Sequence, residues 1–320
     1  MSLKKGYTTG VHAAFAFKSA LFVYLSTSLK TISISKKMDN DDLDVTKGCE
    51  IVVEISSTLK DLTLNPLKHR PQIIKSSSNT LYLFAGKGVG VVTKRGLKIP
   101  PSFPAVNPAP LKAIENIFIN LTKNRNNLKI FASIGVIDGE RIAKDTANEK
   151  VGVLGGISIL GESGFVNPVS ANAYIDSIKE EMRVAFFHKR RVVFTIGKTS
   201  FEMALRSYEK EEIVEIGNFV YDALKMAKSM GFKKIVLIAG VGKITKIAQG
   251  KKNTHNRFGN IDFESLKKEF EIAEDIVTVK RMVEILGKRR EEFYTKMVEK
   301  AKERVFEWIG ERIDILISNR

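Results

Sequence analysis

The second half of the chain alternates short apolar runs with longer stretches of helical periodicity. Residues 192–196 and 235–239 are almost entirely apolar, which is typical of strands buried on both faces of a sheet. Between them, apolar side chains recur three and four positions apart over residues 213–230, as they do in a helix that packs on a sheet. This alternation predicts a Rossmann-like parallel α/β domain over residues 128–320. Its last part, residues 263–320, has the charged, amphipathic pattern of a helical tail.

The first part of the chain mixes strands and helices without this regular alternation. Residues 11–25 have helical spacing, and Thr8 or Thr9 is placed to be the N-cap of the helix. Residues 51–55 and 81–84 indicate strands. We therefore predict a two-domain protein, with an α+β domain over residues 1–127 followed by the α/β domain.

The charge of the chain is unusual. The net charge is +16 and the pI is about 9.7, so the surface attracts polyanions such as nucleic acid or a small polycarboxylate. The single cysteine, Cys49, excludes a disulfide framework, and the four histidines lack metal-site spacing. The longest apolar stretch, residues 11–25, is too short to span a bilayer. These features predict a cytoplasmic protein with no protein-bound metal and no membrane contact, and they leave homo-oligomerisation open.

Two phosphate-binding patterns are incomplete. Gly197 begins a Gly-Lys-Thr sequence that resembles the end of a Walker A loop, but Val192 stands where that loop needs its first glycine. Gly240 and Gly242 follow a buried strand as in a dinucleotide fingerprint, yet Thr245 replaces the third glycine. A strand that ends in Gly-x-Gly before a helix still presents backbone amides to a ligand. The alternative is a simple tight turn.

Residues 155–164 contain four glycines around an apolar triplet. The segment fits a β-hairpin or a bulge. The density of glycine favours a second interpretation, in which a flat ligand approaches the bare backbone closely. Two further features have plainer explanations. The acidic run at residues 39–44 has the composition of a solvated turn, and His255, among lysines and arginine, resembles an ordinary surface histidine.

Six blocks of the sequence, taken together and in order, resemble the cobalt-precorrin-5B C(1)-methyltransferase (CbiD) family of anaerobic cobalamin biosynthesis. The blocks are GYTTG at residues 6–10, DDLDVTKG at 41–48, GKGVGVVTKRGL at 86–97, PAVNPAP at 104–110, VGVLGGISILGESGFVNPVS at 151–170 and GKITKIAQGKKNTHNR at 242–257. Any one block alone is weak evidence, whereas six in the same order are highly specific. The sequence beyond about residue 263 is similar to the family only in its helical character.

The resemblance implies methyl transfer from S-adenosylmethionine to ring carbon C-1 of a cobalt-bearing tetrapyrrole. Cobalt would arrive inside the substrate, so the protein needs no metal ligands of its own. A tetrapyrrole with many carboxylates suits a strongly basic protein. In that interpretation residues 1–127 are the candidate substrate-binding domain.

Within the resemblance, each group of candidate residues has an expected role. The cofactor pocket would be shaped by Gly155, Gly156, Gly240 and Gly242. Substrate carboxylates would be held by Thr8, Thr9, Lys243, His255 and Arg257. Proton transfer or hydrogen bonding to the ring would fall to Asp42, Asp44 and His255.

Two other functions stay open from the sequence. The Gly240 turn is compatible with a nicotinamide-dependent reductase of a corrin precursor, although no acidic residue follows at the spacing that ribose recognition needs. The charge alone is compatible with a nucleic-acid-binding protein, but few aromatic residues interleave with the basic runs. We expect a small-molecule partner rather than nucleic acid.

Overall fold

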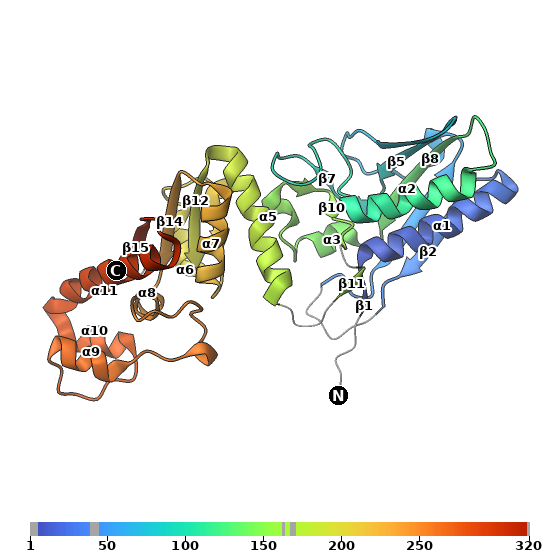
Figure 1. Cartoon of the computed structure of the whole chain (residues 1–320). Coiled ribbons are helices and arrows are strands. Elements are labelled where there is room, and N and C mark those ends of the chain that lie inside the picture. The colour runs from blue at the N-terminus through green and yellow to red at the C-terminus, as the bar shows by residue number, and fades with distance from the viewer. Residues whose placement is uncertain (1–5, 39–44, 162–163, 167–170, 319–320) are drawn as a thin grey trace. The chain divides into compact units, whose positions relative to one another are not determined.

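The computed structural model describes residues 6–38, 45–161, 164–166 and 171–318, and it divides into two compact units. Unit 1 spans Met1–Ala171 and unit 2 spans Asn172–Arg320, and each is described by itself (Figure 1). The boundary thus falls later than the one expected after residue 127. The physical reason is that the strand at residues 129–136 is the central strand of the unit 1 sheet, bonded to a neighbour on each side.

Unit 1 is built on a mixed five-stranded sheet. In spatial order its strands are β2 (Thr31–Lys36), β3 (Glu50–Ser56), β8 (Lys129–Val136), β5 (Asn79–Ala85) and β4 (Gln72–Ser76). β5 and β8 are parallel and the other pairs are antiparallel. Two long helices, α1 (Thr9–Thr27) and α2 (Pro108–Thr122), share one hydrophobic core with the sheet, and Figure 1 shows them side by side. This arrangement agrees with the α+β class predicted for the first part of the chain.

The start of α1 follows from its sequence. Thr8 is the N-cap, and its side-chain oxygen accepts a hydrogen bond from the backbone N–H of Val11. Phe17 and Leu21, four positions apart, are fully buried against the sheet. The helix predicted over residues 11–25 is confirmed.

Short strand pairs bring distant parts of unit 1 together. β1 (Gly6–Tyr7) pairs with β11 (Phe165–Val166), β6 (Gly88–Val89) with β10 (Gly156–Ile157), and β7 (Val91–Val92) with β9 (Val153–Leu154). A bridge also joins Val106 to Ile159. Four of the six sequence blocks are therefore packed on one another. Two short helices lie among them, α3 (Gly139–Ala143) and α4 (Asn148–Val151).

Unit 2 contains a four-stranded sheet in which every pair is parallel. Its order is β13 (Ile213–Glu215), β12 (Arg191–Ile196), β14 (Lys234–Ala239) and β15 (Asp314–Ile317). One face shares a core with α5 (Ala171–Lys189), α7 (Val220–Met230), α8 (Val241–Ala248) and α11 (Arg290–Ile309). The other face packs against α6 (Lys198–Ala204). The predicted parallel α/β character of this part is present.

The remaining helices of unit 2 are short. α9 (Phe263–Phe270) and α10 (Val279–Leu286) add to the larger core, and four single 3₁₀ turns occur in the described part of the whole chain: η1 (Leu59–Asp61), η2 (Lys210–Glu212), η3 (Asn256–Phe258) and η4 (Gly287–Arg289).

Two predictions about unit 2 were wrong in detail. The single helix expected over residues 213–230 is a strand, β13, followed by α7, and the tail expected to be helical ends in β15. Both strands have four residues or fewer. An apolar run that short does not separate a strand from a helical turn by periodicity.

An ion pair between the partly exposed Arg191 and the buried Glu212 holds the start of β13 against β12. Glu212 is fully buried, and both its carboxylate oxygens accept hydrogen bonds of 2.8 Å from the Arg191 guanidinium. The backbone N–H of Glu209 donates a third bond, at 3.1 Å. Burial alone would raise the pKa of Glu212, but the hydrogen bonds from Arg191 and Glu209 outweigh it and hold the pKa below its ordinary value.

We expect Glu212→Gln to destabilise the protein by about 2 kcal/mol, because it removes the counter-ion of the partly exposed Arg191 and turns the NH2 group of a buried amide toward the guanidinium donors. Because the folded-state pKa of Glu212 is lowered, its contribution is present above the unfolded pKa and is lost as the pH falls through the folded one. Urea unfolding should therefore show that the free energies of unfolding of variant and wild type differ less at acid pH than at neutral pH. Glu202→Gln, at an exposed pair, is the control, with an expected change under about 0.5 kcal/mol. An equal effect of both substitutions would contradict the prediction.

Candidate functional site

The carboxyl edge of the unit 2 sheet has the topology of a ligand site. From β12 the chain passes through α6 to β13 on one side, and it later returns through α7 to β14 on the other side. The strand order therefore reverses between β12 and β14. Open α/β sheets bind ligands in the crevice outside the strand ends at such a switch point. The loops that leave these two strands begin with Gly197 and Gly240.

Gly240 and Gly242 at this edge are not explained by the backbone conformation and Cβ contacts that the structure shows. Gly240 has φ −63° and ψ 150°, a conformation open to any residue. A Cβ atom at Gly242 would meet only the Cγ2 of Val279, at 3.9 Å. Backbone strain therefore does not require glycine at position 240, and packing against a Cβ atom does not require it at position 242. A ligand that approaches the first turn of α8 closely would require it.

Two lysines on α8 lie in a polar network beside this edge. The Lys243 ammonium donates to Asn218 Oδ1 at 2.8 Å and to the carbonyl of Thr254 at 3.1 Å. The Lys246 ammonium donates to the same carbonyl at 3.1 Å and to Asn256 Oδ1 at 2.6 Å. Burial lowers the pKa of both lysines, and the charge of Lys246 lowers that of Lys243 further. Sequence reasoning found Lys243 but missed Lys246, although a spacing of three places both on one helical face.

His255 and Arg257 follow this network directly along the chain and are exposed. The Nδ1 atom of His255 accepts a hydrogen bond of 3.2 Å from the backbone N–H of Arg257 and so caps η3. This leaves Nε2 as the ring nitrogen available to a ligand. The Arg257 guanidinium lies 4.8 Å from the ring centre of Phe258. The structure thus places Lys243, His255 and Arg257 in one segment of unit 2, with Gly240 and Gly242.

Gly155 and Gly156 lie in unit 1, and packing accounts for them. A Cβ atom at Gly156 would stand 2.1 Å from the carbonyl oxygen of Gly88, and one at Gly155 would stand 2.8 Å from the side-chain nitrogen of Asn65. Both also have positive φ, at 154° and 81°. The close approach that their composition indicated is therefore made by the protein's own chain. Neither residue lines the cavities described below.

Thr8 and Thr9 also lie in unit 1 and are engaged internally. Thr8 caps α1, and the hydroxyl of Thr9 accepts the N–H of Leu160 at 2.9 Å. Both therefore fasten the start of α1 to the glycine-rich segment. Where these blocks meet, a cavity of about 450 Å³ opens, and its lining is mainly small and apolar: Gly10, Val11, Ala14, Phe15, Lys18, Ala109, Pro110, Ala113, Ile117, Gly161 and Gly164. Asp42 and Asp44 lie outside the described residues.

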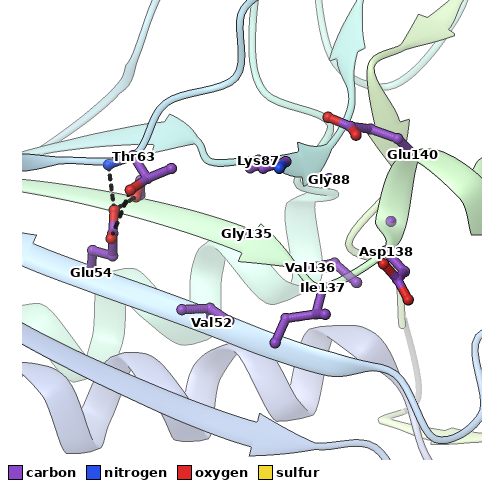
Figure 2. Close-up of a pocket in the computed structure, with 12 residues that line it drawn as sticks. Val52, Glu54, Thr63, Lys87, Gly88, Gly135, Val136, Ile137, Asp138 and Glu140 are labelled. Carbon is purple, nitrogen blue, oxygen red and sulfur yellow. Dashed lines mark hydrogen bonds between the residues drawn. The ribbon is translucent and has the colours of Figure 1, made fainter.

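A second cavity in unit 1, of about 380 Å³, lies at the strands β3 and β8 (Figure 2). Glu54 is buried there, and its carboxylate accepts hydrogen bonds from the N–H of Thr63 at 2.5 Å and from the hydroxyl of Ser133 at 3.0 Å. Figure 2 shows the Thr63 bonds, while Asp138 and Glu140 lie farther along the cavity. Because its oxygens are occupied, Glu54 holds the Thr63 loop on the sheet and is poorly placed to act as a base.

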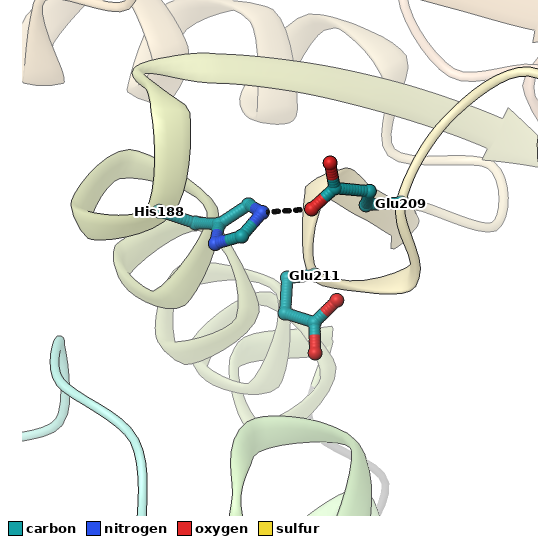
Figure 3. A group of neighbouring side chains, drawn as sticks. All are labelled: His188, Glu209 and Glu211. Carbon is teal, nitrogen blue, oxygen red and sulfur yellow. Dashed lines mark hydrogen bonds and ion pairs between the residues drawn. The ribbon is translucent and has the colours of Figure 1, made fainter.

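One group of possible metal ligands occurs in the part of the chain that the structure describes: His188, Glu209 and Glu211 of unit 2 (Figure 3). The Nε2 atom of His188 lies 2.5 Å from Glu209 Oε2, and Lys189 forms an ion pair with the other oxygen of Glu209. The hydrogen bond from Lys189, followed by that from His188, lowers the pKa of Glu209. These contacts make the group a surface ion-pair cluster. The prediction that the protein binds no metal of its own stays a prediction.

Comparison with known proteins gives consistent matches. The CbiD family model matches residues 26–168. The cobalt-precorrin-5B C(1)-methyltransferase of Methanococcus maripaludis is 32% identical over 96% of this chain and 91% of its own length. Those of Sulfurisphaera tokodaii and Clostridium perfringens are 35% and 30% identical, over 82% and 97% of this chain and 75% and 86% of their own lengths. A crystal structure of a cobalamin biosynthesis protein (cbiD) from Archaeoglobus fulgidus is 24% identical, covers 83% of this chain and 84% of its own, and superposes with a TM-score of 0.36.

These similarities show that the protein is a methyltransferase. The chain belongs to the CbiD family of cobalt-precorrin-5B C(1)-methyltransferases. Among its described helices, none combines the length and the apolar composition that a bilayer crossing needs.

Proposed function

We propose that this protein methylates C-1 of cobalt-precorrin-5B with S-adenosylmethionine as the methyl donor, and that the cofactor binds at the carboxyl edge of the unit 2 sheet. One observation supports the location most strongly. At the switch point between β12 and β14, Gly240 has a conformation open to any residue and Gly242 has room for a Cβ atom, yet both positions leave the backbone bare. Gly155 and Gly156 are left out of the proposed site, because Gly88 and Asn65 occupy the space beside them.

The residues present at this edge fit the cofactor. α8 begins at the carboxyl end of β14, and the positive end of its helix dipole suits the carboxylate of an amino-acid moiety. The absence of a side chain at Gly242 leaves room for a bulky nucleoside close to the backbone. S-adenosylmethionine supplies an electrophilic methyl group when bound. Positioning is then the main task left to the protein, and well-oriented groups can provide about 7–11 kcal/mol.

Candidate substrate-binding groups occur in each unit, and each set is proposed for its own unit. Lys243, His255 and Arg257 lie in one segment with the glycine edge and would bind carboxylates of the macrocycle. Unit 1 as a whole, rather than residues 1–127, is the proposed substrate-binding unit, because its glycine-rich blocks converge on the cavity of about 450 Å³. Thr8 and Thr9 would contribute indirectly to substrate binding, because their hydrogen bonds position the backbone at the start of α1 and at Leu160. Asp42 and Asp44 remain the proposed proton acceptors.

Anaerobic incubation with cobalt-precorrin-5B and S-adenosylmethionine bearing a trideuterated methyl group tests the reaction. We expect the product to contain one labelled methyl group, located at C-1 by mass spectrometry of fragments, and its yield to depend on the enzyme. A mass change that requires NADPH and takes no label would identify a reductase instead. Unchanged substrate with correctly folded enzyme would contradict the proposal.

A further inference from the structure

The two lysines of α8 have no negative partner. The Lys246 residue is only 6% exposed and Thr254 is fully buried. In the described part of the chain, no carboxylate lies within ion-pair distance of either ammonium group. Their acceptors are neutral: the Thr254 carbonyl and the amide oxygens of Asn218 and Asn256.

The other charges that act on this pair are also positive. Lys246 acts on Lys243, and Lys251 acts on Lys246. Both ammonium groups lie 3.1 Å from the same carbonyl oxygen, so two like charges are close neighbours in a partly buried site. Holding a loop carbonyl does not by itself require a charge, because a neutral donor would do so at a lower desolvation cost. The charge of the pair therefore lacks an explanation within the described chain.

The hydroxyl of Thr254 fixes the geometry of the pair. It donates to Asn218 Oδ1 at 2.9 Å, the oxygen that also accepts from Lys243, and the backbone N–H of Thr254 donates to the Asn218 carbonyl at 3.1 Å. Thr254 and Asn218 thus hold both ammonium groups in one orientation. Each ammonium has three N–H donors and uses two of them in these bonds. One donor from each lysine is left.

We propose that Lys243 and Lys246, positioned by Asn218 and Thr254, form a binding site for one carboxylate group. Two remaining N–H donors match the two oxygens of a carboxylate, whereas a phosphate dianion offers more oxygens than the pair can bond. An anion here would neutralise the repulsion between the lysines. That the carboxylate belongs to the macrocycle rests on the function proposed above; the site itself does not.

Calorimetric titration of the full-length protein with propane-1,2,3-tricarboxylate tests the proposal. We expect saturable binding of one molecule, weakened about tenfold or more in both Lys243→Gln and Lys246→Gln, since each removes one of the two charges. Glutamine keeps a donor for the Thr254 carbonyl, and circular dichroism checks that each variant is folded. Lys280→Gln removes an exposed lysine of α10 and is the control for net charge, with unchanged affinity expected.

Carbon-13 NMR of the lysine Cε groups in the wild type gives a second readout that needs no variant. The tricarboxylate should raise the pKa of two lysines that are otherwise lowered. If Lys280→Gln lost as much affinity for the tricarboxylate as Lys243→Gln and Lys246→Gln, or if no lysine pKa rose, the attraction would be non-specific. Either result would overturn the proposal. Tighter binding of inorganic phosphate than of the tricarboxylate would overturn the carboxylate assignment. Because neither measurement uses the methyl donor, a failed methyl transfer would leave the site standing.

Discussion

Replacing Gly242 with leucine is expected to lower the affinity for S-adenosylhomocysteine by about 100-fold or more, equivalent to about 2.7 kcal/mol, while the protein stays folded. A Cβ atom at this position would meet only Val279, at 3.9 Å, so the protein's own atoms leave room where a side chain would begin. Leucine also favours the helix over glycine by up to about 1 kcal/mol. The side chain would instead fill the space above the first turn of α8, where the cofactor is proposed to bind.

Gly242→Ala provides the graded control. A single methyl group should weaken binding less than leucine does, and thermal unfolding should show that both variants are at least as stable as the wild type. If Gly242→Leu binds S-adenosylhomocysteine with wild-type affinity, the cofactor does not approach this turn and the proposed location is wrong. A leucine variant that binds weakly because it is unfolded would be recognised by its circular dichroism.

Replacing Gly156 with alanine is expected to destabilise unit 1 by about 4 kcal/mol or more. The new Cβ would stand 2.1 Å from the carbonyl oxygen of Gly88 and 2.7 Å from the nitrogen of Val89, which are backbone atoms that cannot rotate away. The φ of 154° adds strain for any L residue. Since β6 and β10 pair at this point, their separation would disturb the packing of the sequence blocks. Urea unfolding measures the effect.

Gly48→Ala is the matched control in the same unit. Its φ is +73°, but a Cβ atom there would have no neighbour within 4 Å. We therefore expect a cost of only about 1–2 kcal/mol, from the left-handed conformation alone. The opposite pattern, in which Gly156→Ala stays as stable as the wild type and loses cofactor binding, would restore Gly155 and Gly156 to the cofactor site.

The sequence predicted those parts of the fold that have long, regular patterns. The helix α1 and the buried strands β12 and β14 have enough consecutive apolar positions to be recognised alone. The strands β13 and β15 do not, because they are short and owe their conformation to pairing with β12 and β14. The domain boundary was misplaced for a similar reason. Which sheet β8 joins depends on partners more than 40 positions away along the chain.

The candidate site, like the short strands, could be predicted only in part from the sequence. Gly155-Gly156 and Gly240-x-Gly242 look alike in sequence, since both are glycine turns beside apolar runs. Only the structure separates them: Gly155 is pressed against Asn65 and Gly156 against Gly88, whereas Gly242 has room for a Cβ atom. Lys246 was missed because a lysine on a helix is ordinarily exposed. Its burial results from the return of the chain at Thr254, which periodicity does not reveal.

The central claim is that the methyl donor binds at the carboxyl edge of the unit 2 sheet. Amide NMR of the isotopically labelled full-length protein, titrated with S-adenosylhomocysteine, tests it most directly. We predict saturable shifts concentrated at Gly197, Gly240 and Gly242 and at the neighbouring residues of α6 and α8. Shifts confined to unit 1, at Gly155 and Gly156 or around the cavity beside α1, would contradict the claim.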